Sequence, residues 1–212
     1  MERLTRVVGP AGTNVHILAD GRSREAIAID TAIQSRLGIA GELAARDWSL
    51  RLIVSTHGHW DHIGDNAAVA THAGADIAVH PLDRERLTNP QPLYAPFDIP
   101  PSVPAVELAE GGLVRFGEIR LRVLHTPGHT EGSVCLLAED EGLLFSGDTL
   151  FAAGWGRVDL PGGDEQAMVE SLVRLSGLED HVGVFPGHGR TTTIGAERPW
   201  LELVRDHGRL LA

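Results

Sequence analysis

The sequence predicts a mixed α/β (α+β) fold, formed by one domain over residues 1–212. Short runs of β-branched and aliphatic residues, typical of buried strands, alternate with longer stretches whose apolar residues recur at helical spacing. A length of 212 residues and a hydrophobic fraction of 42% are ordinary for one large globular domain. Several strand-like runs end in a turn that contains Gly or Pro and carries a histidine or an aspartate. The strand ends are therefore the candidate functional edge.

The first part of the chain predicts three adjacent strands. Apolar segments at 4–8 and 13–19 are separated by a Gly-Pro-Ala-Gly turn, which is typical of a hairpin. A third segment, 25–29, completes an antiparallel meander and ends at Asp30. The side chain of Asp30 can cap the helix that follows, which is the interpretation that the sequence favours. It can also lie near a metal site and hydrogen bond to a histidine ligand, and the two roles are compatible.

The rest of the chain continues the alternation of strands and helices. Further strands are expected at 50–56, 76–80, 133–137, 142–145 and 182–185, with short ones between 106 and 124. Helices are expected at 32–46, 63–70, 82–87 and 197–211. One more helix begins at Asp164, whose carboxylate can cap its first turn. A Pro-rich segment at 88–104 interrupts this alternation and is expected to be a functional loop or a linker.

Composition excludes several classes of protein. A net charge of −11 opposes binding to nucleic acid, which requires clusters of basic residues. No apolar run approaches the roughly twenty residues needed to cross a bilayer, and the N-terminus lacks the apolar core of a signal peptide. Cys135 is the only cysteine, so it is expected to serve packing and no internal disulfide can form. A cytoplasmic location is the default expectation, and the sequence does not indicate an oligomeric state.

The densest group of chemically active side chains follows the strand expected at 50–56. Within six residues it contains His57, His59, Asp61 and His62. His57 and His59, two residues apart, can bind one ion, while Asp61 and His62 can turn toward a second ion alongside. Imidazole and carboxylate together suit zinc, iron or manganese. Three histidines and an aspartate at a strand end are hard to explain as solvated surface, so the sequence predicts a metal site.

Three further residues stand in the same position relative to their strands. His129, Asp148 and His188 each follow a predicted strand and lie in a turn that contains Gly or Pro. If those strand ends share one edge of the core, the three side chains converge on the cluster at 57–62.

These motifs resemble those of the metallo-β-lactamase superfamily, and the residues around them resemble its short bacterial glyoxalase II-like hydrolases. The resemblance runs from about Asp30, which matches an early aspartate of the superfamily, to Arg198. Its motifs are His57-x-His59-x-Asp61-His62, Thr-Pro-Gly-His129-Thr, Ser-Gly-Asp148-Thr-Leu-Phe and Pro-Gly-His188-Gly.

The resemblance implies a four-layer αββα sandwich with metals at one edge of two packed sheets. It implies two divalent metal ions, with zinc expected ahead of iron or manganese. The first ion would be held by His57, His59 and His129. The second would be held by Asp61, His62 and His188, and Asp148 would bridge the two ions.

The chemistry implied for such a centre is hydrolysis. Two ions about 3.5–4 Å apart lower the pKa of a bridging water toward about 7, so that hydroxide becomes the nucleophile. Asp61 is the residue expected to orient that nucleophile or to accept its proton, and it is therefore the candidate catalytic residue.

Within the superfamily, the sequence favours a thioester hydrolase. Asp148 stands where true zinc β-lactamases usually carry cysteine, which argues against lactam hydrolysis as the main role. The chain departs from full-length glyoxalase II because it lacks the C-terminal helical extension that helps to bind glutathione. It also has Asp159 and Arg190 where aromatic contacts to glutathione would be expected. The identity of the thiol carrier therefore stays open.

Three other functions stay open as alternatives. The first is a persulfide dioxygenase with one iron, which would consume oxygen, and the second is a lactone hydrolase. The third is a metal-stabilised binding module without catalytic activity. The last is disfavoured because a structural zinc site is normally closed and mononuclear.

The expected partner is a small-molecule thioester. Aromatic residues on loops near the metal motifs predict an apolar pocket wall, formed by Trp60, Trp155 and Tyr94. Arg157 could pair with a carboxylate or phosphate on the thiol carrier. The carrier would then lie along Arg157 and the segment at 88–104.

Overall fold

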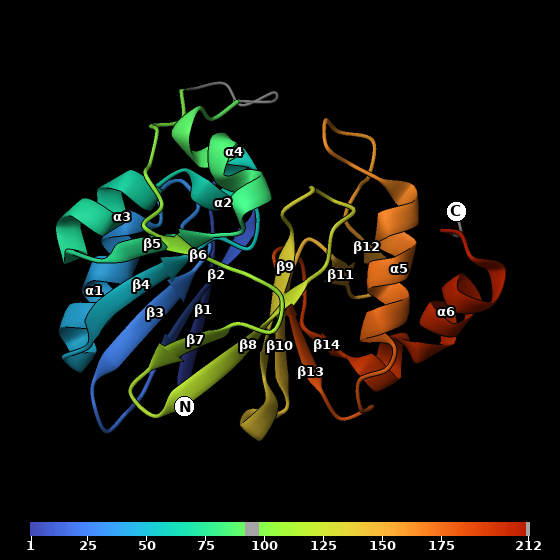
Figure 1. The fold of residues 1–212 in the computed structure, drawn as a ribbon. Helices are drawn as coiled ribbons and strands as arrows, with labels where there is room; N and C mark the ends of the chain where they lie inside the picture. The colour runs from blue at the N-terminus through green and yellow to red at the C-terminus, as the bar shows by residue number, and fades with distance from the viewer. Residues whose placement is uncertain (92–97, 211–212) are drawn as a thin grey trace.

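Two six-stranded sheets form the centre of the molecule, with helices on their outer faces (Figure 1). The computed structural model describes residues 1–91 and 98–210. Across the first sheet the strands lie in the order β1 (Glu2–Val8), β2 (Thr13–Ala19), β3 (Glu25–Ile29), β4 (Ser49–Val54), β5 (Asp76–Val79) and β6 (Val106–Glu107). Across the second sheet the order is β14 (Thr192–Thr193), β13 (Gly183–Pro186), β10 (Leu143–Gly147), β9 (Val134–Ala138), β8 (Ile119–His125) and β7 (Leu113–Phe116).

Helices cover the outer face of each sheet (Figure 1). On the first sheet these are α1 (Arg36–Arg46) and α3 (Asn66–Ala73), and on the second they are α5 (Glu165–Leu175) and α6 (Ile194–His207). The remaining elements are short and lie in the connections: α2 (Trp60–Ile63), η1 (Pro81–Asp83), α4 (Arg84–Thr88), η2 (Glu139–Glu141) and the hairpin of β11 (Leu150–Phe151) with β12 (Gly154–Trp155). The arrangement is the αββα sandwich that the resemblance implied.

Three apolar layers hold this sandwich together. In β3, Ala26 and Ala28 pack toward α1 and α3, while Ile27 and Ile29 face the second sheet. The middle layer, between the sheets, also contains Phe145, and the third layer packs α5 and α6 against the outer face of the second sheet. Because central strands are buried on both faces, their sequences are nearly continuous apolar runs rather than alternating ones.

The predicted meander is confirmed, and helical crossovers then make the rest of the first sheet parallel. β1, β2 and β3 pair antiparallel, whereas β3, β4 and β5 pair parallel. Parallel neighbours need a crossover connection, which α1 supplies between β3 and β4 and α3 supplies between β4 and β5. The carboxyl ends of β3, β4 and β5 therefore lie at one edge, where Asp30 and the cluster at 57–62 follow them.

Several helix boundaries differ from those that the sequence predicts. Asp164 does cap α5, since its Oδ1 accepts a hydrogen bond of 2.9 Å from the Ala167 amide. The helix expected from residue 32 begins only at Arg36, and its N-cap residue is Ser35. The helix expected over 63–70 is two helices, α2 and α3. The closing helix begins three residues earlier than expected, because the Thr193 side chain caps α6.

The interpretation of Asp30 as a helix cap is therefore wrong. Asp30 lies five residues before the Ser35 cap position, in a left-handed backbone conformation with φ 57°. Its amide donates to the Val54 carbonyl. The side chain is buried and faces the strand ends rather than α1.

Candidate metal centre

The candidate metal ligands lie at one edge of the two sheets. In the first sheet the loop after β4 carries the cluster at 57–62, and in the second sheet His129, Asp148 and His188 follow β8, β10 and β13. β8 and β10 are both antiparallel to β9, and β10 is parallel to β13. These three strands therefore run in the same direction and end at the same edge.

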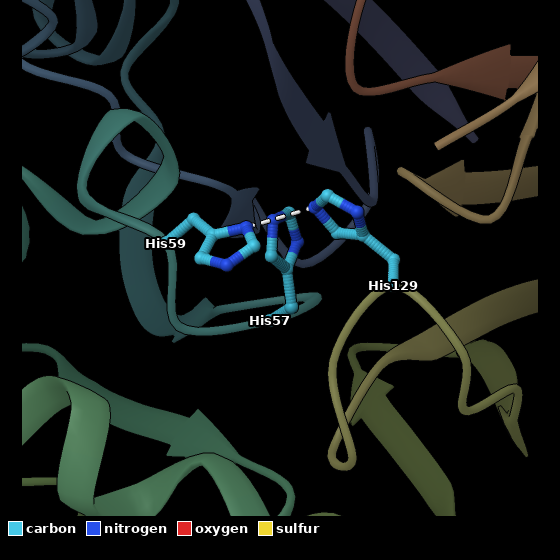
Figure 2. Close-up of side chains that lie close together, drawn as sticks. All are labelled: His57, His59 and His129. Carbon is cyan, nitrogen blue, oxygen red and sulfur yellow. Dashed lines mark hydrogen bonds between the residues drawn. The ribbon is translucent and has the colours of Figure 1, made fainter. Parts of the chain in front are cut away.

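The first group of ligands consists of the imidazoles of His57, His59 and His129 (Figure 2). One nitrogen from each ring lies within 4.8 Å of the others, and His59 Nδ1 is 2.8 Å from His129 Nε2. All three residues are buried. Three ring nitrogens that point at one another are arranged to donate electron pairs to a cation, because neutral imidazole binds metal through an unprotonated nitrogen.

The second group consists of Asp61, His62 and His188. His188 Nε2 lies 3.1 Å from Asp61 Oδ2 and 3.1 Å from His62 Nε2. Asp61 and His62 come from α2, a helix of four residues that begins directly after His59. The short helix therefore separates the ligands of the two groups within one motif.

The carboxylate of Asp148 lies between the two groups. Its Oδ1 is 3.4 Å from His62 Nε2, while its Oδ2 is 3.6 Å from His129 Nε2 and 3.5 Å from His188 Nε2. His57, His62 and Asp148 form a further set of ligand atoms within 4.8 Å of one another. This placement is that of a ligand shared by two cations.

Unpartnered polar atoms in the site fit bound cations. Within the described residues, the buried atoms His57 Nε2 and Asp148 Oδ1 make no hydrogen bond. Buried polar atoms nearly always have a partner, so each of these two atoms needs a partner of another kind. The donor set of imidazole and carboxylate matches zinc, iron or manganese. The residues present therefore fit a metal centre.

Protonation favours metal binding in the first group. Burial, followed by the nearby His129 and His62, lowers the pKa of His59 to about 3. Burial and the neighbouring imidazoles also hold the pKa of His57 well below its usual value. Both rings are therefore neutral at pH 7, which is the form that binds metal.

In the second group, neighbouring charges favour the protonated form of His62 instead. Burial disfavours the charged form of His62, but Asp148, Asp61 and Asp30 raise the pKa of His62 well above its usual value. Burial alone would raise the pKa of Asp148, yet His62 and the other nearby histidines lower it. A cation bound here would replace the proton on His62, and its positive charge would then balance the carboxylates in place of that proton.

Hydrogen bonds to the outer nitrogens fix the orientation of the ligand rings. Asp30 Oδ2 accepts from His62 Nδ1 at 2.9 Å, so Nε2 of that ring faces the centre. The Thr56 amide and hydroxyl each donate to Asp30 at 2.8 Å. His129 Nδ1 donates to the Arg157 carbonyl at 2.7 Å. Such outer contacts fix the tautomer of a metal-binding histidine, which is the second interpretation given above for Asp30.

A pocket of about 380 Å³ opens beside the ligands. Trp60 and Arg157, two of the predicted substrate contacts, line it together with Phe151 and Leu160. The sequence prediction missed Phe151 and Leu160, although Phe151 belongs to the motif around Asp148. Asp61, the candidate catalytic residue, also lines this pocket.

Of the other two aromatic residues predicted at the pocket wall, only Trp155 lies in the described part of the chain. Trp155 does not line the metal pocket, and the prediction that it walls the substrate site is corrected. Its ring packs 5.5 Å from that of Trp200, against the apolar layer beneath α5 and α6. Pairing of β11 with β12 turns the side chain to that side. Tyr94 lies outside the described residues.

The single cysteine, Cys135, and the histidines outside the metal motifs do not belong to the ligand groups. Cys135 is buried in β9, with Sγ 3.3 Å from the Thr126 hydroxyl, and burial raises the pKa of its thiol to about 11. His125 stacks on His80 with ring centroids 4.1 Å apart. These contacts agree with a packing role for Cys135 and with structural roles for both histidines.

Comparison with known proteins identifies the family. A family model described as the metallo-beta-lactamase superfamily matches residues 8–188, and the chain belongs to this superfamily. An uncharacterized protein of Aquifex aeolicus is 36% identical over 197 residues, which cover 90% of this chain and 91% of the relative. The hydroxyacylglutathione hydrolase GloC of Haemophilus influenzae is 32% identical over 158 residues, which cover 72% of this chain and 74% of the relative.

Three solved structures share the fold. The BLEG-1 B3 metallo-beta-lactamase has a TM-score of 0.87 and 31% identity, with 94% of this chain and 99% of that chain covered. TTHA1623 in a di-iron-bound form has a TM-score of 0.82 and 31% identity, with 92% of this chain and 96% of that chain covered. ETHE1 from Myxococcus xanthus has a TM-score of 0.79 and 25% identity, with 98% of this chain and 91% of that chain covered. Across the described residues, no helix has the length and apolarity needed to cross a membrane.

Proposed function

We propose that this protein is a metal-dependent hydrolase of small-molecule thioesters. The observation that carries the proposal is the position of Asp148 between two histidine-containing ligand groups, where it also lines the pocket. The similarity to hydroxyacylglutathione hydrolases supports a thioester as substrate. A cytoplasmic location fits this role and is part of the proposal.

The cofactor in this proposal is a pair of divalent cations, with zinc first and iron or manganese as alternatives. His57, His59 and His129 would hold one cation, and Asp61, His62 and His188 the other, with Asp148 shared. When bound, such a pair polarises a carbonyl oxygen and lowers the pKa of water.

The chain's own residues bind and orient the substrate. Trp60, Phe151 and Leu160 give the pocket an apolar wall for the acyl or thiol portion. Asp61 reaches the pocket from the ligand cluster. Burial raises its pKa, but His62 and His188 have the larger combined effect and lower it. An anionic carboxylate at this position can accept a proton from the attacking water.

Arg157 is the candidate contact to the thiol carrier. It lines the pocket, and its guanidinium forms two hydrogen bonds of 2.7 Å to Asp159 in the same loop. An anionic carrier would share the guanidinium with Asp159 or compete with it. Replacing Arg157 with alanine should mainly raise KM for an anionic thioester, because binding made equally in ground and transition states is lost. Steady-state kinetics on a neutral thioester serve as the control, and a fall in kcat at unchanged KM would place Arg157 in the chemistry.

Two observations favour testing other chemistries. The likeness to ETHE1 fits the alternative of a persulfide dioxygenase with one iron, and the likeness to the di-iron-bound TTHA1623 makes iron a candidate metal. The likeness to the BLEG-1 metallo-beta-lactamase makes a lactam a necessary comparison, although Asp148 argues against it. Lactone hydrolysis and a non-catalytic binding module remain as weaker alternatives.

The deciding experiment combines metal analysis with parallel assays on the purified protein. Substrates are thioesters of glutathione, coenzyme A and other small thiols, a lactone, a cephalosporin, and a persulfide in an oxygen electrode. Metal-dependent release of thiol from a thioester, absent in Asp148→Ala, supports the proposal. Oxygen uptake with persulfide by an iron-loaded protein that leaves all thioesters intact would overturn it.

A further inference from the structure

A buried carboxylate outside the ligand set lies beside the loops that carry the first group. Asp83 is fully buried. It ends η1 and occupies the N-cap position of α4, where an aspartate ordinarily accepts a hydrogen bond from its own helix. Here the side chain makes no such capping bond. Its carboxylate is turned instead toward the neighbouring loops, and the function proposed above makes no use of it.

Each oxygen of Asp83 has its own backbone partner, in two different loops. The Gly58 amide donates to Oδ2 at 2.7 Å, and the Gly132 amide donates to Oδ1 at 2.9 Å. The Thr130 hydroxyl also donates to Oδ2, at 2.8 Å. Arg86, one turn along α4, places Nε 3.4 Å from Oδ1 and supplies the counter-charge that a buried carboxylate requires.

The three hydrogen-bond donors flank the ligands of the first group. Gly58 lies between His57 and His59, and Thr130 follows His129 directly. The first loop extends from the first sheet and the second loop from the second sheet, so one carboxylate joins them beside the metal site. Such charge-assisted hydrogen bonds are stronger and shorter than neutral ones.

Both glycines are required by this close approach. A Cβ at Gly58 would lie 2.4 Å from the Arg86 Cβ, and a Cβ at Gly132 would lie 2.7 Å from the Asp83 amide nitrogen. Neither distance is sterically possible without movement of the backbone. The loops are therefore shaped around the segment that carries Asp83 and Arg86.

We infer that Asp83 is a positioning residue for the first metal, because it fixes the backbones of Gly58 and Gly132 so that His57, His59 and His129 converge. In the second group Asp30 positions His62 in a comparable way, by a direct hydrogen bond to its imidazole ring. The inference rests on the metal centre proposed above but not on the choice of substrate.

The test is a comparison of Zn²⁺ binding by Asp83→Asn, Glu85→Gln and wild type. Asparagine has one acceptor oxygen and an NH₂ group, so it cannot accept from both backbone amides. Glu85 is exposed on the same helix, so Glu85→Gln makes the same chemical change away from the loops. Affinities are measured by competition with a chromophoric chelator, and ¹⁵N resonances of the histidine rings report which imidazoles bind Zn²⁺.

In Asp83→Asn we expect one of two Zn²⁺ affinities to fall by about 10- to 100-fold, the usual effect of losing an outer contact. The change should appear at the rings of His57, His59 and His129, while those of His62 and His188 respond as in wild type. Asp30→Asn should change the response of the His62 ring, which it contacts directly, and Glu85→Gln should match wild type. Equal Zn²⁺ binding by Asp83→Asn and Glu85→Gln would overturn the inference.

A second variant covers the case in which Asp83→Asn fails to fold. Thr130→Val keeps the shape of the side chain and removes the hydroxyl that donates to Asp83 and also contacts the Ser133 hydroxyl. It should weaken the same Zn²⁺ affinity by a smaller factor, and unchanged binding in this variant would count against the inference. Wild-type protein that binds no Zn²⁺ would refute the metal centre itself, which is a different outcome from normal Zn²⁺ binding in the variants.

Discussion

Asp148 is the residue on which both ligand groups depend, since its two oxygens face histidines of different groups. Replacing Asp148 with alanine should abolish hydrolysis and lower the metal content, because each of the two proposed cations would lose a carboxylate ligand. We expect the activity to fall by more than about 100-fold, the upper range for loss of an outer metal contact. Metal content by elemental analysis and turnover of the best thioester measure the effect.

The matched control is Asp140→Ala, which removes an exposed aspartate that pairs with Arg120. This variant should keep the metal and the activity of the wild type. Wild-type metal content and rate in Asp148→Ala would contradict the assignment of Asp148 as a shared ligand.

His16, which is not a candidate metal ligand, should make the free energy of unfolding depend on pH. It is buried in β2, 3.0 Å from the Thr5 hydroxyl and 3.3 Å from the Pro186 carbonyl, and burial lowers its pKa to about 4. In the unfolded chain His16 binds a proton near pH 6.5, so the unfolded state takes up more protons between pH 6.5 and 4. The corresponding stability is present above pH 6.5 and is lost as the pH falls toward 4.

The expected size of this effect is about 3 kcal/mol, from 1.36 kcal/mol per pH unit over that interval. Chemical denaturation in the presence of chelator at pH 7.5 and pH 4.5 measures it. His16→Gln cannot titrate there, so its free energy of unfolding should fall less on acidification than that of the wild type. Identical losses in both proteins would show that His16 is not a source of the pH dependence.

At the level of single elements, α5 depends on its cap. Asp164 supplies the capping bond to Ala167, and the helix packs on the second sheet through Met168, Leu172 and Leu175. Asp164→Ala should lower the free energy of unfolding by about 1 kcal/mol. Asp164→Asn should retain most of the stability because asparagine also caps helices. Denaturant unfolding with Glu170→Ala as an exposed control tests this, and equal stability of the alanine variants would contradict it.

The short segment formed by η1 and α4 contacts both the loops that carry the metal ligands and the wall of the pocket. It has few residues and one turn of helix, yet it carries Asp83 and Arg86. Arg86 also donates to the Pro161 carbonyl at 2.9 Å, next to the pocket residue Leu160. This element therefore joins the metal loops to the pocket wall.

For the whole molecule, metal binding should act as a link between the sheets. The first ligand group takes His57 from the loop after β4 and His129 from the loop after β8, so a cation bound there joins the two halves. A ligand that binds only the folded state adds about 2.7 kcal/mol when its free concentration is one hundred times its Kd. Chelation should therefore lower the unfolding temperature, and added Zn²⁺ should restore it.

Thermal unfolding by circular dichroism checks this prediction. Asp148→Ala is the control and should respond less to chelator than the wild type does. A wild-type protein whose unfolding temperature is the same with and without chelator would not hold a metal between its sheets.

The strands and the ligand motifs could be predicted from the sequence because both leave local signals. Strands buried on two faces require apolar runs, so β2 and β3 were predicted with their observed bounds. His57, His59, Asp61 and His62 stand within one turn, and a cluster of that composition has few explanations other than a metal. The Asp164 cap is likewise a contact over three residues.

The remaining features were decided by contacts between segments that are distant in the chain. Asp30 precedes a helix, as a cap would, but its carboxylate bonds to His62 because the parallel pairing of β3 and β4 brings them together. Trp155 is only two residues from Arg157 in sequence, yet its ring packs on Trp200 and does not line the metal pocket. Asp83 carried no signal at all, since its partners Gly58 and Gly132 approach it only when both sheets are assembled. Local sequence determines which residues can bind metal, whereas the packing of the two sheets decides which residues hold them in place.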